Sequence, residues 1–135
     1  MIIEHVALWT NKLEVLKTYY TTFFGGVSNQ KYENKSKKFV SYFLTFGSGA
    51  RLELMTKEGV PKNLNDKVGT QHQGLIHLAF GAQSKQEVDE KAKELSKAGF
   101  PILSGPRTTG DGYYEFETLD PDQNRIEVTW RVQRT

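Results

Sequence analysis

Residues 74–81, Gly-Leu-Ile-His-Leu-Ala-Phe-Gly, form a short apolar stretch with one histidine, His77, near its centre. A similar stretch occurs 72 residues earlier, where His5 lies within residues 4–9, Glu-His-Val-Ala-Leu-Trp. In both stretches an alanine and a large apolar residue follow the histidine at the same spacing. Self-similarity at a fixed offset is the sequence signature of a repeated structural unit. The two stretches therefore predict that the chain consists of two similar halves.

A second pair of segments repeats in the same way. Residues 51–54, Arg-Leu-Glu-Leu, return 74 residues later as Arg-Ile-Glu-Val at 125–128. Each segment alternates charged and apolar residues, as a strand with one buried face does. Each also contains one glutamate, Glu53 in the first segment and Glu127 in the second. Two histidines and two glutamates thus occupy matching positions in the two halves.

Each half is expected to contain one helix after its first strand. The first helix should begin at Thr10 or Asn11, with Glu14 completing a capping box, and should end at Gly25. The second should begin at Ser84, where residues 84–87 form a full capping box. The residues expected on the buried faces of the two helices are Leu13, Leu16, Tyr20 and Phe23, then Val88, Ala92 and Leu95.

Alternating and β-branched segments bounded by turn residues predict the strands. In the first strand His5 should lie on the same face as Trp9, with Glu4 on the other face. A loop is expected over residues 104–112 and a tight turn over 120–124. The expected strands are residues 2–9, 27–32, 39–46, 50–56, 75–80, 101–103, 113–119 and 125–131.

This order predicts an α+β fold made of two tandem β-α-β-β-β modules whose curled sheets surround a common site. We expect one domain over residues 1–135, with modules at 1–56 and 74–135 joined by a linker at 57–73. The linker segment is rich in Gly, Pro, Asn and Asp and has few apolar residues.

The composition is that of an ordinary globular protein, with 37% hydrophobic and 25% charged residues. A net charge of +2 is too small to favour nucleic acid as a partner, and the lysines within residues 31–38 read as an exposed turn. No apolar run is long enough to cross a membrane, and the first residues do not resemble a signal peptide. A cytoplasmic protein without a membrane partner is therefore expected.

The chain has no cysteine, so any metal must be held by nitrogen and oxygen atoms. His5, Glu53, His77 and Glu127 offer two imidazoles and two carboxylates, which suit a divalent ion such as Ni, Zn, Co, Mn or Fe(II). An ion with open coordination positions polarises a carbonyl, and a carboxylate beside it can take a proton from the adjacent carbon.

A purely structural interpretation competes with the metal site. A histidine in an apolar strand is more often a packed core residue, and a glutamate in a strand more often faces solvent. Arg51 and Arg125 stand two residues before Glu53 and Glu127, and could pair with them. The third histidine, His72, lies in the linker and is not included in the site.

The paired β-α-β-β-β pattern, the two histidine stretches and residues 120–127, Asp-Pro-Asp-Gln-Asn-Arg-Ile-Glu, resemble the vicinal oxygen chelate superfamily. That superfamily includes glyoxalases, bleomycin-resistance proteins and ring-cleaving dioxygenases. The chain length and the His/Glu/His/Glu order look most like the small bacterial lactoylglutathione lyases. The resemblance implies a homodimer that acts on the hemithioacetal of a 2-oxoaldehyde through an enediolate, with Glu127 moving the proton and Glu53 beside it.

Two departures from the lyases bear on the substrate. Gln123 stands where glycine is usual, and Trp9-Thr10-Asn11 lacks the arginine that lyases use for the glutathione carboxylate. One alternative is another metal-dependent activity of the superfamily, such as epimerisation or thiol transfer. The other is a non-catalytic protein that sequesters a small molecule. The aromatic residues that could line its pocket are Trp9, Tyr42, Tyr113 and Tyr114.

Overall fold

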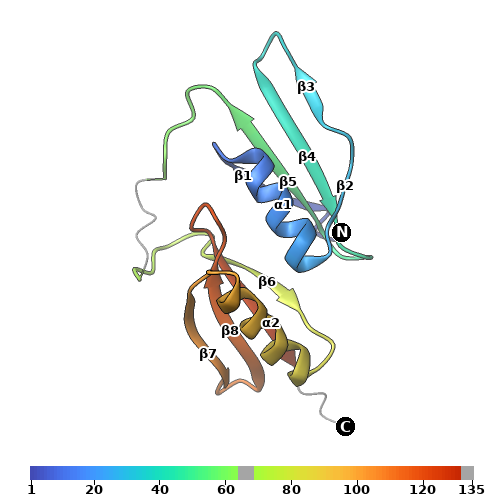
Figure 1. Ribbon diagram of the computed structural model, residues 1–135. Helices are drawn as coiled ribbons and strands as arrows, with labels where there is room; N and C mark the ends of the chain where they lie inside the picture. Colours follow the sequence, from blue (N-terminus) through green and yellow to red (C-terminus); the bar gives the residue numbers. More distant parts are fainter. Residues whose placement is uncertain (64–68, 132–135) are drawn as a thin grey trace. The chain divides into compact units, whose positions relative to one another are not determined.

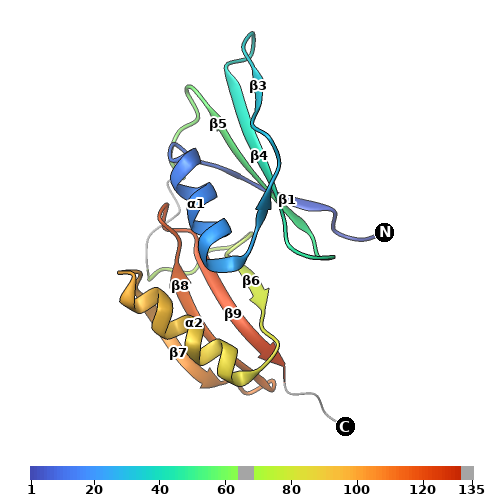
Figure 2. The same cartoon turned by 45° about the vertical axis from the view of Figure 1, so that its right-hand side comes forward.

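The computed structural model describes residues 1–63 and 69–131 of the chain. The chain divides into two compact units, with the boundary between residues 64 and 65 (Figures 1 and 2). Part of the predicted linker, residues 64–68, lies outside the described residues. The rest of the linker contains the end of one strand, because the strand that begins at Arg51 extends to Lys57.

The first unit is a five-stranded sheet with one helix. Its strands β1 and β5 pair in parallel, whereas β4 pairs with β5, β2 and β3 in antiparallel fashion. The spatial order is β1-β5-β4-β2, with β3 beside β4. The elements are β1 (His5–Trp9), α1 (Leu13–Phe24), β2 (Val27–Ser28), β3 (Tyr32–Asn34), β4 (Phe39–Thr45) and β5 (Arg51–Lys57).

The second unit repeats this arrangement with four strands. The spatial order is β6-β9-β8-β7, and the first strand again pairs in parallel with the last. The elements are β6 (His77–Gly81), α2 (Lys85–Lys97), β7 (Ile102–Thr108), β8 (Tyr113–Leu119) and β9 (Arg125–Arg131). The predicted α+β fold with two similar modules is confirmed. The expected strand at 27–32 is instead two short strands, β2 and β3.

Each helix covers one face of the sheet in its own unit. Helix α1 contacts β4 and β5, and α2 contacts β7, β8 and β9. The apolar residues between helix and sheet are almost fully buried: Leu16, Tyr20, Leu44 and Leu54 in the first unit, and Val88, Leu95, Phe116 and Ile126 in the second. Since successive strand residues point to opposite faces, the glutamates of β5 and β9 lie on the face away from the helix. Among the described residues, no helix is long and apolar enough to span a membrane.

The predicted start of the first helix is wrong. Helix α1 has no side-chain cap, and Lys12 takes the N-cap position. The Thr10 hydroxyl accepts a hydrogen bond from the Lys12 backbone N–H at 2.8 Å, in a local turn before the helix. Glu14 faces the sheet instead and accepts a hydrogen bond from the Tyr42 hydroxyl at 2.9 Å. The predicted end is right, because Gly25 ends the helix in the left-handed conformation.

The first part of the predicted loop over residues 104–112, as far as Thr108, belongs to a strand. Strand β7 continues to Thr108, and its pairing with β8 shifts register between Ile102 and Ser104 and again before Arg107. Such irregularities let a strand pass through a Gly-Pro pair that would interrupt a regular ladder. By contrast, the predicted helix cap at Ser84 and the turn at residues 120–124 are present, although the Glu87 carboxylate accepts a hydrogen bond from the Gln83 backbone N–H instead of from that of Ser84.

Candidate functional site

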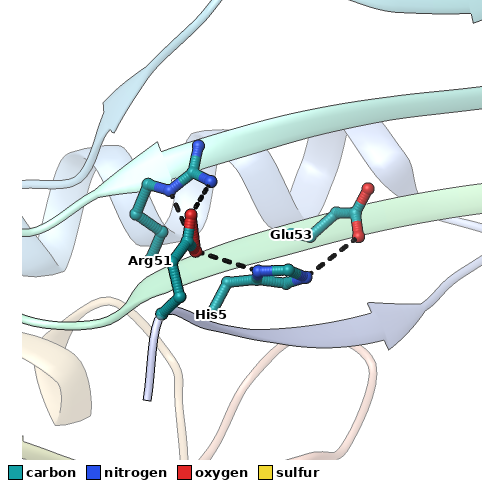
Figure 3. Close-up of polar contacts among 4 residues, drawn as sticks. His5, Arg51 and Glu53 are labelled. Carbon is teal, nitrogen blue, oxygen red and sulfur yellow. Dashed lines mark hydrogen bonds and ion pairs between the residues drawn. The ribbon is translucent and has the colours of Figure 1, made fainter. Parts of the chain in front are cut away.

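The first unit brings His5 and Glu53 together on the open face of its sheet. Ala7 of β1 pairs with Glu53 of the parallel strand β5, so His5, two residues before Ala7, shares the face of Glu53. The Nε2 atom of His5 lies 3.9 Å from Oε1 of Glu53. Figure 3 marks this contact with a dashed line. The His5 side chain is 42% exposed and that of Glu53 only 16% exposed. This pair is therefore reachable from solvent through the imidazole.

The other ring nitrogen of His5 is also engaged. His5 Nδ1 lies 2.9 Å from Oε2 of Glu4, whose carboxylate also pairs with the guanidinium of Arg51. These two hydrogen bonds, the one from Arg51 first, lower the pKa of the exposed Glu4 carboxyl below its ordinary value. The ring of Phe43 contacts both partners of Glu4, edge-on against His5 and beneath the Arg51 guanidinium. The prediction that Glu4 faces away from this group is wrong.

The second unit repeats the histidine–glutamate pair. Ala79 of β6 pairs with Glu127 of β9, so the parallel register of the first unit recurs. Nε2 of His77 lies 3.5 Å from Oε2 of Glu127. The Glu127 side chain is 14% exposed and that of His77 is 36% exposed. Each predicted histidine thus contacts the predicted glutamate of its own half.

Glu127 lies among other carboxylates that the sequence analysis did not single out. Glu117 of β8 is directly opposite it, and Glu115 is on the same face two residues away. The pKa of Glu127 is raised to about 7, first by burial and then by a hydrogen bond with Glu115 and the charges of Glu115, Glu117 and Asp111. At neutral pH this carboxyl can therefore both accept and release a proton.

The arginines do not neutralise the two glutamates as the structural interpretation requires. Arg51 pairs with Glu4 through a two-pronged contact. The Nη1 atom of Arg125 lies 3.8 Å from Oε1 of Glu117, and its Nη2 atom donates to the backbone oxygen of Thr70 at 3.4 Å. Glu53 and Glu127 face histidines instead.

Within each pair, the distance between the imidazole nitrogen and the carboxylate oxygen is close to the distance between two ligands of one ion. Two atoms that each lie about 2.1 Å from an ion are about 3.0 Å apart at a right angle and about 3.4 Å apart at a tetrahedral angle. The observed separations of 3.9 and 3.5 Å are slightly larger, so small rotations of the side chains would suffice. Within residues 1–63 and 69–131, no group of three or more acidic or histidine side chains is placed to hold a metal. Each unit thus brings together two of the four side chains that the sequence predicts as metal ligands.

Two of the four aromatic residues suggested for a pocket have structural roles. The hydroxyl of Tyr42 donates to Glu14 of α1, and the hydroxyl of Tyr114 donates to Asp89 of α2 at 2.6 Å. Both tyrosines therefore tie a helix to its sheet and do not lie on the open face. Trp9 is 45% exposed and shares the open face with His5. Tyr113 is half-buried and shares the face of Glu115.

One more polar atom lies on the open face of the second sheet. Thr129 follows Glu127 by two residues and is directly opposite Glu115. Its Oγ1 atom is buried, and within the described part of the chain it has no hydrogen-bond partner. An unpaired buried hydroxyl costs free energy, so a bound molecule that hydrogen-bonds to it would be favoured.

Comparisons with known proteins agree with this fold. Residues 2–128 match the family model of the Glyoxalase/Bleomycin resistance protein/Dioxygenase superfamily. An uncharacterized protein of Bacillus subtilis (strain 168), YqjT, is 27% identical over 128 residues, which cover 93% of this chain and 95% of that protein.

Two solved structures illustrate the likeness in fold. A glyoxylase/bleomycin resistance protein/dioxygenase domain from Frankia sp. EAN1pec aligns with a TM-score of 0.82 at 18% identity, covering 100% of this chain and 95% of that one. The trypanothione-dependent glyoxalase I of Leishmania major aligns with a TM-score of 0.73 at 22% identity, covering 95% of this chain and 85% of that one.

Proposed function

Because the chain belongs to the Glyoxalase/Bleomycin resistance protein/Dioxygenase superfamily, we propose that it is a metal-dependent lyase or isomerase of the glyoxalase type. Its substrate would be the hemithioacetal of a 2-oxoaldehyde and a thiol. The observation that carries the proposal is the repeated pair of one imidazole and one carboxylate, His5 with Glu53 and His77 with Glu127, in matching registers.

In this proposal the two pairs hold one divalent ion, with both halves taken from one chain or from two copies in a homodimer. Two nitrogen and two carboxylate ligands suit Ni, Zn, Co, Mn or Fe(II) and leave one or two positions open. When bound, such an ion polarises a substrate carbonyl and stabilises negative charge on its oxygen.

The chain itself would supply the proton transfer. Glu127 would take the proton from the carbon beside the carbonyl and return it to the neighbouring carbon, with Glu53 as the flanking carboxylate. A general acid–base group works best when its pKa is near the working pH. The pKa of Glu127, raised to about 7 by burial and by neighbouring carboxylates, supports this role.

We propose further that the thiol is not bound as glutathione is in the lyases. The segment that follows His5 has Trp9-Thr10-Asn11 in place of an arginine. Thr10 is buried, and its hydroxyl is occupied by the Lys12 N–H. No cation therefore comes from this segment to bind the carboxylate of a thiol.

A second candidate function is sequestration of a small aromatic molecule without catalysis. Three aromatic rings support it on the open face of the first sheet: Phe39 contacts Trp9 and Tyr32 edge-on at 6.0 and 6.1 Å. Trp9 is 45% and Tyr32 53% exposed, which is high for such large apolar rings. Ligand affinity that survives complete removal of metal would favour this function over the first.

The test combines metal analysis with a turnover assay. The purified protein should contain or take up one divalent ion per ligand set, and should isomerise the methylglyoxal adduct of at least one thiol in a panel. Glu127→Gln should keep the fold and lower turnover by about 10²-fold or more, as expected for loss of a proton-transfer group. Glu58→Gln, which changes an exposed carboxylate paired with Lys38, should leave turnover unchanged. Failure to bind any divalent ion would overturn the proposal.

A further inference from the structure

We propose that Glu4 is a positioning residue for His5: anchored by Arg51, its carboxylate holds the imidazole so that the Nε2 lone pair faces Glu53. The inference about the imidazole stands on the geometry of the first unit. Its consequence for metal binding rests on the function proposed above.

Arg51 fixes the position of the Glu4 carboxylate. Its Oε2 atom lies 2.9 Å from His5 Nδ1 and 3.4 Å from Arg51 Nε, while Oε1 contacts Arg51 Nη2. A guanidinium that grips a carboxylate through two nitrogens fixes its orientation as well as its position. The guanidinium in turn lies 4.2 Å from the centre of the Phe43 ring. Arg51 therefore holds the carboxylate whose Oε2 atom contacts His5.

The Glu4 carboxylate determines which ring nitrogen of His5 carries the proton. An ionised carboxylate can only accept hydrogen bonds, so Nδ1 of His5 must be the donor. A neutral imidazole carries one N–H, and Nε2 is then left with its lone pair. That lone pair lies on the side of Glu53, whose Oε1 is 3.9 Å away (Figure 3). Histidines that bind metals in this way usually donate the second nitrogen to a carboxylate or carbonyl, which fixes the ring and makes it more basic.

The side chain of Glu4 is not needed to pair β1 with β5. The backbone oxygen of Glu4 accepts a hydrogen bond from the Arg51 backbone N–H at 2.9 Å. This bond extends the parallel ladder of β1 and β5 by one residue, whatever side chain residue 4 carries. Removing the carboxylate should therefore leave the strand in place and change only the state of the imidazole.

The second unit provides an internal contrast. The residue before His77 is Ile76, which offers no side-chain acceptor. His77 nevertheless approaches its glutamate as His5 does, at 3.5 Å. The two histidines thus differ in what holds them, and only His5 should respond to a change at residue 4.

The test reads the protonation of each ring nitrogen in the metal-free protein by two-dimensional ¹⁵N–¹H NMR at about pH 8, where imidazole is largely neutral. The wild-type protein should show His5 with its proton on Nδ1. In Glu4→Ala, His5 should become a mixture dominated by the Nε2–H form, while His77 should keep its wild-type spectrum. Glu58→Ala removes an exposed carboxylate of the same unit and should change neither. An unchanged His5 in Glu4→Ala would overturn the proposal.

Zn²⁺ affinity of the same variants, measured by competition with a chromogenic chelator, tests the consequence. Glu4→Ala should bind about 10- to 100-fold more weakly than wild type, the usual loss when the outer partner of a ligating histidine is removed. Glu4→Gln keeps an acceptor oxygen and should fall between the two. Equal affinity in all three proteins would refute the positioning of a ligand. If wild type binds no Zn²⁺ but the NMR change is seen, the metal function fails and the role of Glu4 on the ring stands.

Discussion

Glu117 of β8 lies directly opposite Glu127 of β9, so two carboxylates share one face of an antiparallel strand pair. Like charges in this position repel each other and destabilise a sheet. Arg125 lies 3.8 Å from Glu117 and offsets part of the repulsion. Glu127 is more buried and faces His77, and its pKa is raised to about 7. The sheet therefore keeps a destabilised carboxylate on its open face, which is expected where function matters more than stability.

The stability of the metal-free protein should fall as pH rises through this pKa. An unfolded Glu titrates near 4.5, whereas folded Glu127 titrates near 7, so between these values the folded state binds more protons. Stability from this group is therefore present below about pH 4.5 and is lost as pH rises through about 7. The shift corresponds to a free energy on the order of 3 kcal/mol.

Urea unfolding with a chelator present, at a series of pH values, measures this effect. The Glu127→Gln variant cannot ionise and should gain stability relative to wild type as pH rises from 5 to about 8. Subtracting the two curves removes the contributions of the groups that do not interact with residue 127. A constant difference across this range would show that Glu127 titrates normally.

The neighbouring carboxylates should also set the pH at which metal binds. A metal must displace the proton from Glu127, so affinity should rise with pH up to about 7 and then level off. Glu115→Gln removes the largest specific partner that raises this pKa. The plateau should then begin at lower pH, as measured by calorimetric titration with Zn²⁺. Glu90→Gln on the exposed side of α2 serves as the control, and an equal shift in both variants would contradict the explanation.

How far the sequence could predict this site depends on the register of the strands. Strands 113–119 and 125–131 were predicted at their observed bounds, because regular alternation flanks a turn rich in Asp, Pro and Asn. Pairing the two strands across that turn places Glu117 opposite Glu127, so the acidic face could have been found from sequence. The pKa of Glu127 could not, because it depends on burial.

Other features were decided by competition between local partners. At the start of α1 both Thr10 and Asn11 are plausible caps, and Glu14 fits a capping box. The structure uses Glu14 to bind Tyr42 instead, a contact 28 residues apart in sequence. Alternation places Glu4 on the face opposite to His5, yet its carboxylate contacts the adjacent imidazole, because alternation describes the Cβ direction and not the reach of a long side chain. The partner that a long side chain contacts cannot be predicted from the periodicity of the sequence.

The two helix starts should respond differently to loss of a polar side chain. The Ser84 hydroxyl accepts a hydrogen bond from the Glu87 backbone N–H at 3.1 Å, so Ser84→Ala should destabilise the protein by about 1 kcal/mol. Asn11 is exposed and is not the cap of α1, so Asn11→Ala should change stability by less than about 0.5 kcal/mol. Thermal or urea unfolding of the two variants measures the difference. Equal losses would mean that Asn11 does cap α1.

We expect a methyl group at Gly105 to disturb the backbone of strand β8, which carries Glu115 and Glu117. A Cβ atom there would lie 2.5 Å from the backbone oxygen of Glu115 and 3.1 Å from the Cα atom of Phe116. Backbone atoms of a paired strand cannot rotate away as a side chain can, and the φ of +78° at Gly105 is itself unfavourable for alanine. We therefore expect Gly105→Ala to cost more than about 1 kcal/mol in unfolding free energy.

The matched control is Gly110→Ala, five residues further on, where a Cβ atom would meet nothing within 4 Å. That variant should be as stable as wild type or slightly more stable. Because the clash at Gly105 falls on the backbone of Glu115, it should also shift the pH at which Glu127 titrates, whereas Gly110→Ala should not. A destabilised Gly105→Ala protein with an unchanged Glu127 titration would show that Glu115 does not transmit the distortion. The measurement is the same pH series of unfolding curves, now recorded for both alanine variants with and without Glu127→Gln.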